Sequence, residues 1–567
     1  MALDRREVIR LLAAMGLAPW VLSACDDGDG GGGKPGDAGT DGPLSDGEVA
    51  DLGLPDDGFP RYTWEGEPGP ETLFEHGVAS GDPLPEAVVL WTRVSVDSGS
   101  DPVEVFYEIA TLPDFRQRTA VGTLSAEAVR DFTVKHDATG LTPGTTYYYR
   151  FSAQGRTSRT GRTRTAPVGA VDHLRFAVAS CASLAHGYFH AYRQIAERAD
   201  LDAVIHLGDY IYEYESGSYG DVRPYEPVHE IVSLADYRLR FSQYHRDPDL
   251  QAVHQQHPII PIWDDHETAN NSWRDGAENH NADEGDWQAR KAAAIQAWYE
   301  WLPVRDTEDH HIYRRLRYGE LVDLIMLDTR LWGRDEPVGG NTAQVDRFSE
   351  ELTLLGQDQE MWLREQLAGS TAQWKVVGQQ VMMGQLLAAG APISEGGGTA
   401  LNFDQWDGYV ASRNRFFQIL ADNSLDDVVV LTGDIHTSWA IDLSPDPNDP
   451  ALYDRETGEG AVAVEFVTPG ITSPGLAALS PALLNLIYQQ NGHIKWADLA
   501  QKGYLVLDVT PERVQADWYL LTAIKELEYT APVFARGYAS FTGENHLVAA
   551  EAPAPEKDDA PALAPEG

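Results

Sequence analysis

The feature that most limits how this chain can fold is a set of five apolar runs. Each run is followed by side chains that can bind metal ions. The runs are FAVAS, AVIHL, IIPIW, WKVV and VVVL. Parallel sheets bury such runs, and loops at the carboxyl ends of their strands converge on ligands. The side chains that follow the runs are Cys181, Asp209, Tyr212, Asp265, His266, Gln379, Gln380, Asp434 and His436. The pattern predicts a hydrolytic site for several metal ions at one sheet edge.

Helical stretches alternate with these strand-like runs over residues 172–530. The candidate helices span 188–199, 234–245, 286–301, 357–368 and 405–421. Such alternation predicts an α/β (α+β) domain with a layered β core flanked by helices.

The segment before this domain has a different pattern. VVLWTRV, VEVFYEIA, FTVKHDA and TTYYYRFSA alternate apolar and polar residues and are separated by turn residues. They predict a small antiparallel β-sandwich, similar to a fibronectin type III module. The expected organisation is a signal at 1–25, a disordered linker at 26–69, the β-sandwich at 70–168, the α/β domain at 172–545 and a disordered tail at 546–567.

The N-terminus has the pattern of an export signal. Arg5 and Arg6 precede an apolar run, Leu11 to Leu22, that is too short to span a bilayer. The run ends in Leu-Ser-Ala-Cys, which resembles the lipobox of bacterial lipoproteins. We expect a membrane-anchored lipoprotein, exported by the twin-arginine route to the periplasmic or extracellular face and acylated on Cys25.

Two alternatives concern the chain's two cysteines. The lipobox could be an ordinary cleavage site that happens to contain Cys25. A disulfide from Cys25 to Cys181 is also conceivable, but it would tie a disordered tail to a buried strand end.

The charge of the chain excludes one class of partner. The 567 residues include 43 basic and 88 acidic side chains, for a net charge of -45. Such a balance opposes general affinity for nucleic acid, so no nucleic-acid partner is expected. We expect a monomer that acts on a phosphate ester.

Three short motifs resemble those of calcineurin-like metallophosphoesterases: Gly-Asp-x-x-Tyr at 208–212, Asp-His-Glu at 265–267 and Gly-Asp-x-His at 433–436. Together with Cys181, FEHGVASGDP, VLWTRV, LDTR, VEFVTPGITS and KGYLVLDVTPE, they are similar to the alkaline phosphatase D (PhoD-like) branch. The resemblance runs from about residue 70 to 545. It implies a metallophosphoesterase domain and a site that holds iron and calcium.

The resemblance implies two metal positions. One has the ligands Cys181, Asp209, Tyr212 and His436, whose thiolate, phenolate and carboxylate donors suit Fe(3+). The other has the ligands Asp209 as a bridge, Asp265, Asp434 and either Gln379 or Gln380. Its oxygen donors favour Ca(2+) over zinc. Gln379 and Gln380 could equally be structural, and Asp264 competes with Asp265 for the ligand role.

Two further residues are candidates for catalysis. His266 is expected to stabilise charge or to protonate the leaving alkoxide, after attack by a metal-activated bridging oxygen. Arg330 is expected to clamp phosphate as a bidentate donor, or else to be a structural ion-pair partner. Asn270 and Asn271 could add polar contacts or ligands.

The function predicted from the sequence is an exported metal-dependent phosphoric ester hydrolase, acting on phosphomonoesters or phosphodiesters. One alternative is a phospholipase D-like phosphodiesterase. Another is a catalytically dead surface-binding lipoprotein. Each candidate ligand alone could be structural, but five strand ends with suitable donors favour an intact metal site.

Overall fold

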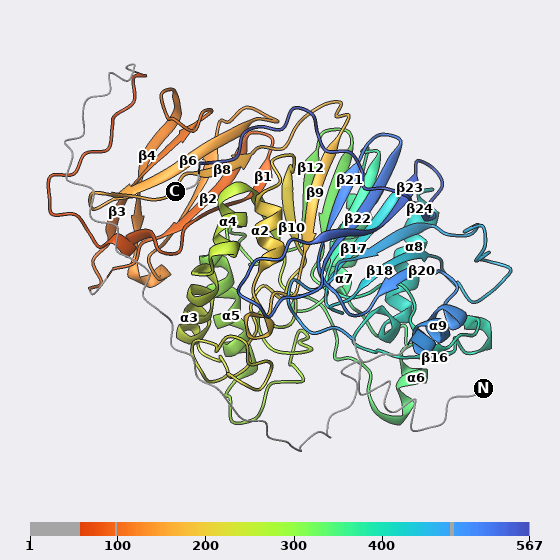
Figure 1. Ribbon diagram of the computed structural model, residues 1–567. Helices are drawn as coiled ribbons and strands as arrows, with labels where there is room; N and C mark the ends of the chain where they lie inside the picture. Colours follow the sequence, from red (N-terminus) through yellow and green to blue (C-terminus); the bar gives the residue numbers. More distant parts are fainter. Residues whose placement is uncertain (1–56, 97–98, 477–480, 566–567) are drawn as a thin grey trace.

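The computed structural model describes residues 57–96, 99–476 and 481–565 (Figure 1). Within these residues, two large sheets form the body. The first has the order β24-β23-β22-β21-β9-β10-β11-β1-β2-β5, and the second has the order β12-β13-β14-β17-β19-β18-β20. A smaller sheet of β3, β4, β6, β7 and β8 lies at one side of the body, on the left in Figure 1, and β15 pairs with β16.

The strands of the ten-stranded sheet are β1 (Val78–Leu84), β2 (Ala87–Arg93), β5 (Thr133–Thr139), β9 (Leu174–Ala179), β10 (Ala203–His206), β11 (Pro258–Pro261), β21 (Lys502–Val509), β22 (Arg513–Leu521), β23 (Val533–Phe541) and β24 (Val548–Ala550). Those of the seven-stranded sheet are β12 (Arg314–Tyr318), β13 (Val322–Met326), β14 (Trp374–Gln379), β17 (Val428–Thr432), β18 (Ser438–Leu443), β19 (Ala463–Val467) and β20 (Ile494–Asp498). The others are β3 (Val103–Ala110), β4 (Arg118–Ala126), β6 (Thr146–Ala153), β7 (Arg156–Thr157), β8 (Gly161–Arg164), β15 (Leu387–Ala389) and β16 (Thr399–Ala400).

The α-helices are α2 (His190–Ala196), α3 (Leu234–His245), α4 (Pro248–Gln256), α5 (Trp287–Trp301), α6 (Ala343–Asp346), α7 (Gly356–Ala368), α8 (Val410–Asp422) and α9 (Pro481–Gln490). The 3-10 helices are η1 (Glu71–Phe74), η2 (Ala128–Arg130), η3 (Leu184–His186), η4 (Gly340–Thr342), η5 (Ile393–Glu395) and η6 (Trp406–Gly408). All five predicted helices have a counterpart, and the helix predicted at 234–245 has those bounds. Helix α4 was not predicted, although Asp247 caps it and Pro248 begins it.

The core lies between the two large sheets. In β17, Val429 and Leu431 belong to the cluster shared with the ten-stranded sheet. Val430 points the other way and packs with residues of α7 and α8. Strands β9, β10, β11 and β1 are parallel neighbours, as are β13, β14, β17 and β19. These findings confirm the predicted α/β (α+β) fold with its layered core.

The strands predicted as a β-sandwich belong to two different sheets. Val88 and Leu90 of β2 pack against Val105 and Ile109 of β3. Strand β1 pairs with β2 on one side and, in parallel, with β11 on the other. One layer of the sandwich is therefore continuous with the main sheet.

Two segments predicted to be disordered are ordered where the structure describes them. Asp57, from the linker, forms an ion pair with the buried Arg118. The tail predicted as disordered from residue 546 contains β24, and the backbone of Ala554 and Ala564 donates to side chains of the body. Both alanines are buried. These polar partners satisfy the hydrogen-bonding groups of the extended backbone. The composition of a segment does not reveal that such partners exist.

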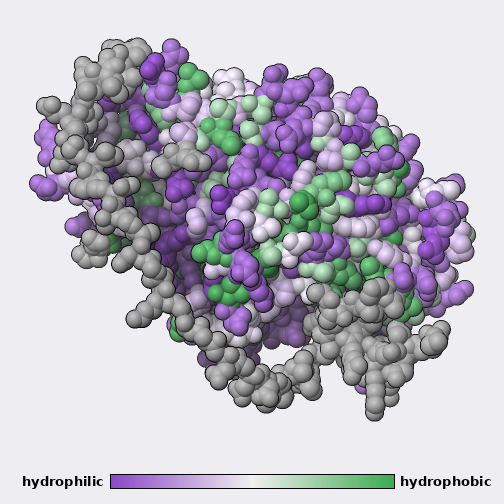
Figure 2. Space-filling model, in the orientation of Figure 1, coloured by the Kyte–Doolittle hydropathy of each residue, from purple (hydrophilic) through white to green (hydrophobic). Residues whose placement is uncertain are grey.

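The predicted export signal and most of the linker, residues 1–56, lie outside the described residues. Within the part that is described, no helix has the length and hydropathy needed to cross a membrane. The visible face of the molecule is largely hydrophilic, with small separate apolar areas (Figure 2).

Candidate metal centre

The predicted ligands come together at the carboxyl ends of parallel strands from both large sheets. Cys181 follows β9, Asp209 follows β10 and Asp265 follows β11, while Asp434 follows β17. A cavity of about 480 Å³ opens there. Its lining includes Asp209, Asp265, His266, Asn270, Asn271, Asp404, Asp434 and His436.

Several of these residues have an unusual backbone conformation. The left-handed φ values are 59° at Cys181, 55° at Asp209, 61° at Asp434 and 60° at His436. Residues other than glycine rarely adopt this region, and such strain gathers at functional sites. The strand ends are thus bent so that their side chains point to a common centre.

The donor atoms form three overlapping groups, each with its members within 4.8 Å of one another. The groups are Cys181 with Asp209 and His436, Asp209 with Asp265 and His266, and Asp264 with Asp265 and Asp434. Asp209 and Asp265 each belong to two groups. Such sharing is the arrangement expected of carboxylates that bridge neighbouring cations.

Carboxylate oxygens without hydrogen-bond partners indicate whether metal ions fit this centre. Oδ1 of Asp209 and Oδ2 of Asp264 are buried without a hydrogen-bond partner among the described residues. A buried carboxylate oxygen without a donor is costly. Cations at the centre would supply the missing partners, so the residues present fit a metal cluster.

Tyr212 lies inside this centre. Its hydroxyl donates to Oδ2 of Asp209 at 2.8 Å, accepts from Ser473 at 2.6 Å and lies 3.2 Å from Nε2 of His436. Burial, reinforced by Asp209, raises the pKa of Tyr212 and of Cys181 well above their usual values. Both side chains are therefore neutral unless a bound cation stabilises the phenolate or thiolate.

The structure favours the ion-pair alternative for Arg330 over the predicted phosphate clamp. Its side chain is fully buried, and its nitrogens contact Asp264 at 2.5 Å, Asp404 at 2.7 Å and Asp434 at 2.6 Å. Each guanidinium nitrogen is thus already paired with a carboxylate. Arg330 is the ion-pair partner that the sequence left as an alternative, and it fixes carboxylates of the centre.

The two glutamines after β14 are structural. Gln379 donates to Thr432 at 2.6 Å and accepts from the indole of Trp406. Gln380 accepts from Thr329 and donates to two backbone carbonyls. Their amide groups therefore already have partners in the protein, which favours the structural interpretation of both.

Asp264 and Asp265 have different surroundings. Asp265 lines the cavity and accepts from the backbone of His266 and Asn271. Asp264 lies behind it, against Arg330. The side chain of Asn271 donates to Glu278, while Asn270 lines the cavity. Asp264 and Asp265 belong to the same donor group, and of the two only Asp265 lines the cavity.

His266 is held by a carboxylate that the sequence analysis missed. Nδ1 of His266 lies 2.7 Å from Oε2 of the fully buried Glu213. Burial alone would lower the pKa of His266, but the Glu213 and Asp265 carboxylates outweigh it and raise the pKa well above its usual value. These carboxylates favour the protonated ring, and Glu213 occupies Nδ1.

Glu267 was also missed, and it joins two loops of the centre. Its carboxylate accepts from the backbone N–H groups of Asp209, Tyr210 and Asp264. Its place in the Asp-His-Glu motif was the available signal. Asp404 had no such signal, because the strand before it, β16, has only two residues and no apolar run.

Comparison with known proteins shows similarity to PhoD-like phosphatases. The PhoD-like phosphatase family matches residues 176–518, and the N-terminal domain of PhoD-like phosphatases matches residues 63–167. Alkaline phosphatase D of Bacillus subtilis (strain 168) is 38% identical over 474 residues, which cover 80% of this chain and 78% of that protein. A solved structure of PhoD has a TM-score of 0.77 at 34% identity, and the match covers 86% of this chain and 94% of that chain.

Proposed function

Because the chain belongs to the PhoD-like phosphatase family, we propose that it is an exported, metal-dependent phosphoric ester hydrolase. The observation that supports metal dependence most directly is the set of three overlapping donor groups, joined through Asp209 and Asp265. The unpartnered oxygens beside them supply the electrostatic reason. The complete donor set also favours an enzyme over a protein that only binds.

Two kinds of cation are proposed for the centre. Cys181, Asp209, Tyr212 and His436 would hold Fe(3+), because thiolate, phenolate and carboxylate donors stabilise that ion. Asp265 and Asp434, with Asp209 as the bridge, would hold Ca(2+) through oxygen donors. When bound, such ions supply Lewis-acid chemistry: they polarise phosphoryl oxygens and lower the pKa of water.

Among the side chains that are not proposed to bind a metal ion, His266 has the clearest role. It lines the cavity, and Glu213 fixes its ring and favours its protonated form. In the proposed reaction Nε2 of His266 gives its proton to the departing alkoxide. Glu213 then stabilises the orientation of the neutral ring for the next turnover.

Export and lipid anchoring belong to the same proposal and depend on Arg5, Arg6 and Cys25. Replacing both arginines with lysine should leave precursor in the cytoplasm. Cys25→Ser should release active enzyme from the membrane fraction, and if that variant stays on the membrane, the lipobox is not the anchor.

The test of the activity combines metal analysis with turnover. Purified protein should contain iron and calcium and should hydrolyse p-nitrophenyl phosphate or its bis-ester. A calcium-selective chelator should abolish turnover, and Ca(2+), but not Zn(2+), should restore it. Asp209→Ala should lose metal and activity, while Asp221→Ala, a change at an exposed aspartate, should keep both. Full activity in metal-free protein would refute the proposal.

A further inference from the structure

Two motifs of the chain, VEFVTPGITS and KGYLVLDVTPE, supply no candidate ligand, yet both reach the metal centre. Strand β21 begins with the second motif, at Lys502, and runs antiparallel to β9. Leu505 of β21 pairs with Val178 of β9, and the same register continued to the strand end brings Lys502 opposite Cys181. The topology therefore places a lysine at the carboxyl end of β9, where the candidate iron ligands gather.

The buried side chain of Lys502 contacts the main chain of one of these ligands. Nζ of Lys502 donates to the backbone carbonyl of His436 at 2.9 Å, and the residue is 6% exposed. Within the described part of the chain, no carboxylate forms an ion pair with this ammonium group. An ammonium group buried with so few partners is costly. Its one polar contact is therefore the feature that a role for Lys502 has to explain.

The segment that follows the first motif leaves room for this contact. A Cβ atom at Gly475 would lie 2.7 Å from Nζ of Lys502 and 3.4 Å from the carbonyl oxygen of His436. A side chain at this position would thus displace the ammonium group. The carbonyl of the preceding residue, Pro474, lies 2.9 Å from Nδ1 of His436. Lys502 and this segment together contact His436 at its main chain and at its ring.

His436 is the candidate iron ligand that depends most on such support. Cys181, Asp209 and Tyr212 are each at most 1% exposed, whereas 16% of the His436 side chain is exposed. Packing therefore fixes the first three more firmly than it fixes His436. The φ of 60° at His436 is also strained, and such a conformation persists only where the surroundings enforce it. The hydrogen bond from Lys502 holds the peptide group that follows this strained residue.

The ring of His436 is held in one tautomer. A carbonyl oxygen only accepts hydrogen bonds, so in the neutral ring Nδ1, beside the carbonyl of Pro474, carries the proton. Nε2 is then the unprotonated nitrogen, and it lies 3.2 Å from the Tyr212 hydroxyl and 3.4 Å from Oδ2 of Asp209. Histidine ligands of metal ions typically donate their other ring nitrogen to an acceptor in this way.

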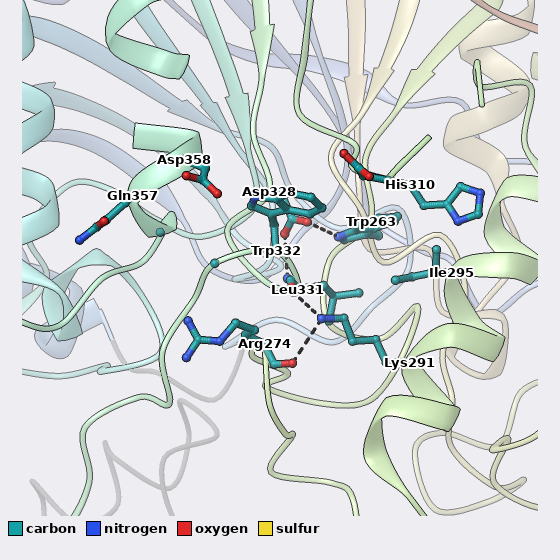
Figure 3. Close-up of a pocket in the computed structure, with 13 residues that line it drawn as sticks. Trp263, Arg274, Lys291, Ile295, His310, Asp328, Leu331, Trp332, Gln357 and Asp358 are labelled. Carbon is teal, nitrogen blue, oxygen red and sulfur yellow. Dashed lines mark hydrogen bonds between the residues drawn. The ribbon is translucent and has the colours of Figure 1, made fainter. Parts of the chain in front are cut away.

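A lysine bonded to main-chain carbonyls is not in itself unusual in this chain. Nζ of Lys291 donates to the carbonyls of Leu331, at 2.6 Å, and Arg274, at 3.2 Å, in a second cavity of about 530 Å³ (Figure 3). That cavity shares no lining residue with the cavity of the metal centre. Lys502 differs from Lys291 because its acceptor is the carbonyl of a candidate metal ligand.

We infer that Lys502 is a positioning residue for His436. By holding the carbonyl of His436, it fixes the direction in which Nε2 enters the centre, while the carbonyl of Pro474 fixes the rotation of the ring. The inference rests on the proposed function, because it concerns the ligands assigned there to Fe(3+). Outer partners of metal ligands contribute a factor of about 10 to 100 in metal affinity.

The experiment measures the iron affinity of the full chain by competition with a chelator, together with its visible absorption. Lys502→Met keeps an apolar stem but removes the donor. It should weaken iron binding about tenfold or more and shift the absorption band, while the calcium content stays the same. Lys375→Met is the matched control and should bind iron as the wild type does. Nζ of Lys375 also donates to two backbone carbonyls, those of Gln373 and Asp426, but at the start of β14 and away from the centre.

A double variant separates positioning from general structural support. If Lys502 acts through His436, adding Lys502→Met to His436→Ala should cause no further loss of iron affinity. Additive losses would overturn the inference, as would a Lys502→Met protein that binds iron as tightly as the wild type. In both outcomes the iron in the wild type leaves the proposed function intact. A wild type without iron would instead overturn the iron assignment and, with it, the inference.

Discussion

The guanidinium Nε of Arg330 lies 2.5 Å from Oδ1 of Asp264, and this contact joins the loop after β13 to the loop after β11. Each strand belongs to a different large sheet. The position of the candidate metal-binding carboxylates therefore depends on a buried cation between the sheets.

Replacing Arg330 with methionine should destabilise the fold and lower the metal content. Removing one partner of a buried ion-pair network costs about 3–5 kcal/mol, because the remaining charges stay buried. Urea unfolding and metal analysis measure both effects. Arg364→Met is the control: its pair with Asp422 is about half exposed and should contribute about 0–1 kcal/mol. An Arg330 variant with normal stability and metal content would contradict this role.

Replacing Glu213 with glutamine should lower kcat while the metal content stays the same. An amide stabilises the protonated His266 ring less than a carboxylate does, so less acid is available. General acid catalysis contributes a factor of about 10² to 10⁴. The loss should therefore be large for alkyl phosphates and small for p-nitrophenyl esters, whose leaving group departs without a proton. Glu215→Gln, two residues away on the exposed surface, should behave as the wild type.

The same comparison with His266→Ala separates two roles. An equal loss on both kinds of ester would leave His266 only a charge-stabilising role. Loss of metal in this variant would make His266 a ligand, as its membership of the second donor group allows.

Cys181→Ser and Tyr212→Phe should each weaken the visible absorption of the purified protein. Thiolate and phenolate bound to Fe(3+) give charge-transfer bands, and both side chains lie in the centre. Most of the bound iron should also be lost from Cys181→Ser. Tyr219→Phe is the control, because its ring stacks 5.3 Å from that of Tyr212, whereas the hydrogen bonds to Asp209 and His436 come from the Tyr212 hydroxyl. A colourless, fully active wild type would exclude the iron assignment.

Stability should fall as the pH drops below about 6.5, because several histidines are buried as neutral rings. Burial lowers the pKa of His206, His254 and His257 to about 3. The unfolded chain binds protons at these groups below about pH 6.5 and the folded chain does not, so stability is complete above that pH and is lost below it. Each group contributes about 2 kcal/mol between pH 6.5 and 5.

Denaturant unfolding at a series of pH values measures this dependence. His254→Gln should make the slope shallower, and His229→Gln, which changes an exposed histidine, should not. A slope that is unchanged in His254→Gln would show that the loss of stability arises elsewhere.

The strand ends and their donors could be predicted because local sequence carries them: an apolar run, a turn, then a ligand. The partners of Arg330 could not be predicted, because Asp264, Asp404 and Asp434 come from three loops that are far apart in the sequence. A donor such as Gln380 has the same sequence signal whether it faces a metal ion or the backbone. Only the burial of the side chain and its neighbours in the structure distinguish a metal ligand from a structural residue.

The parallel pairing of β1 with β11 has a consequence for how the chain can be divided. A fragment that begins at residue 172 would leave β11 as an edge strand, with Ile259 and Ile260 uncovered. Unpaired apolar edges promote association with other chains. It would also lose the buried hydrogen bond from the Trp91 indole to the carbonyl of Glu300. Two segments that are distinct along the sequence thus behave as one piece for expression, dissection or exchange between relatives.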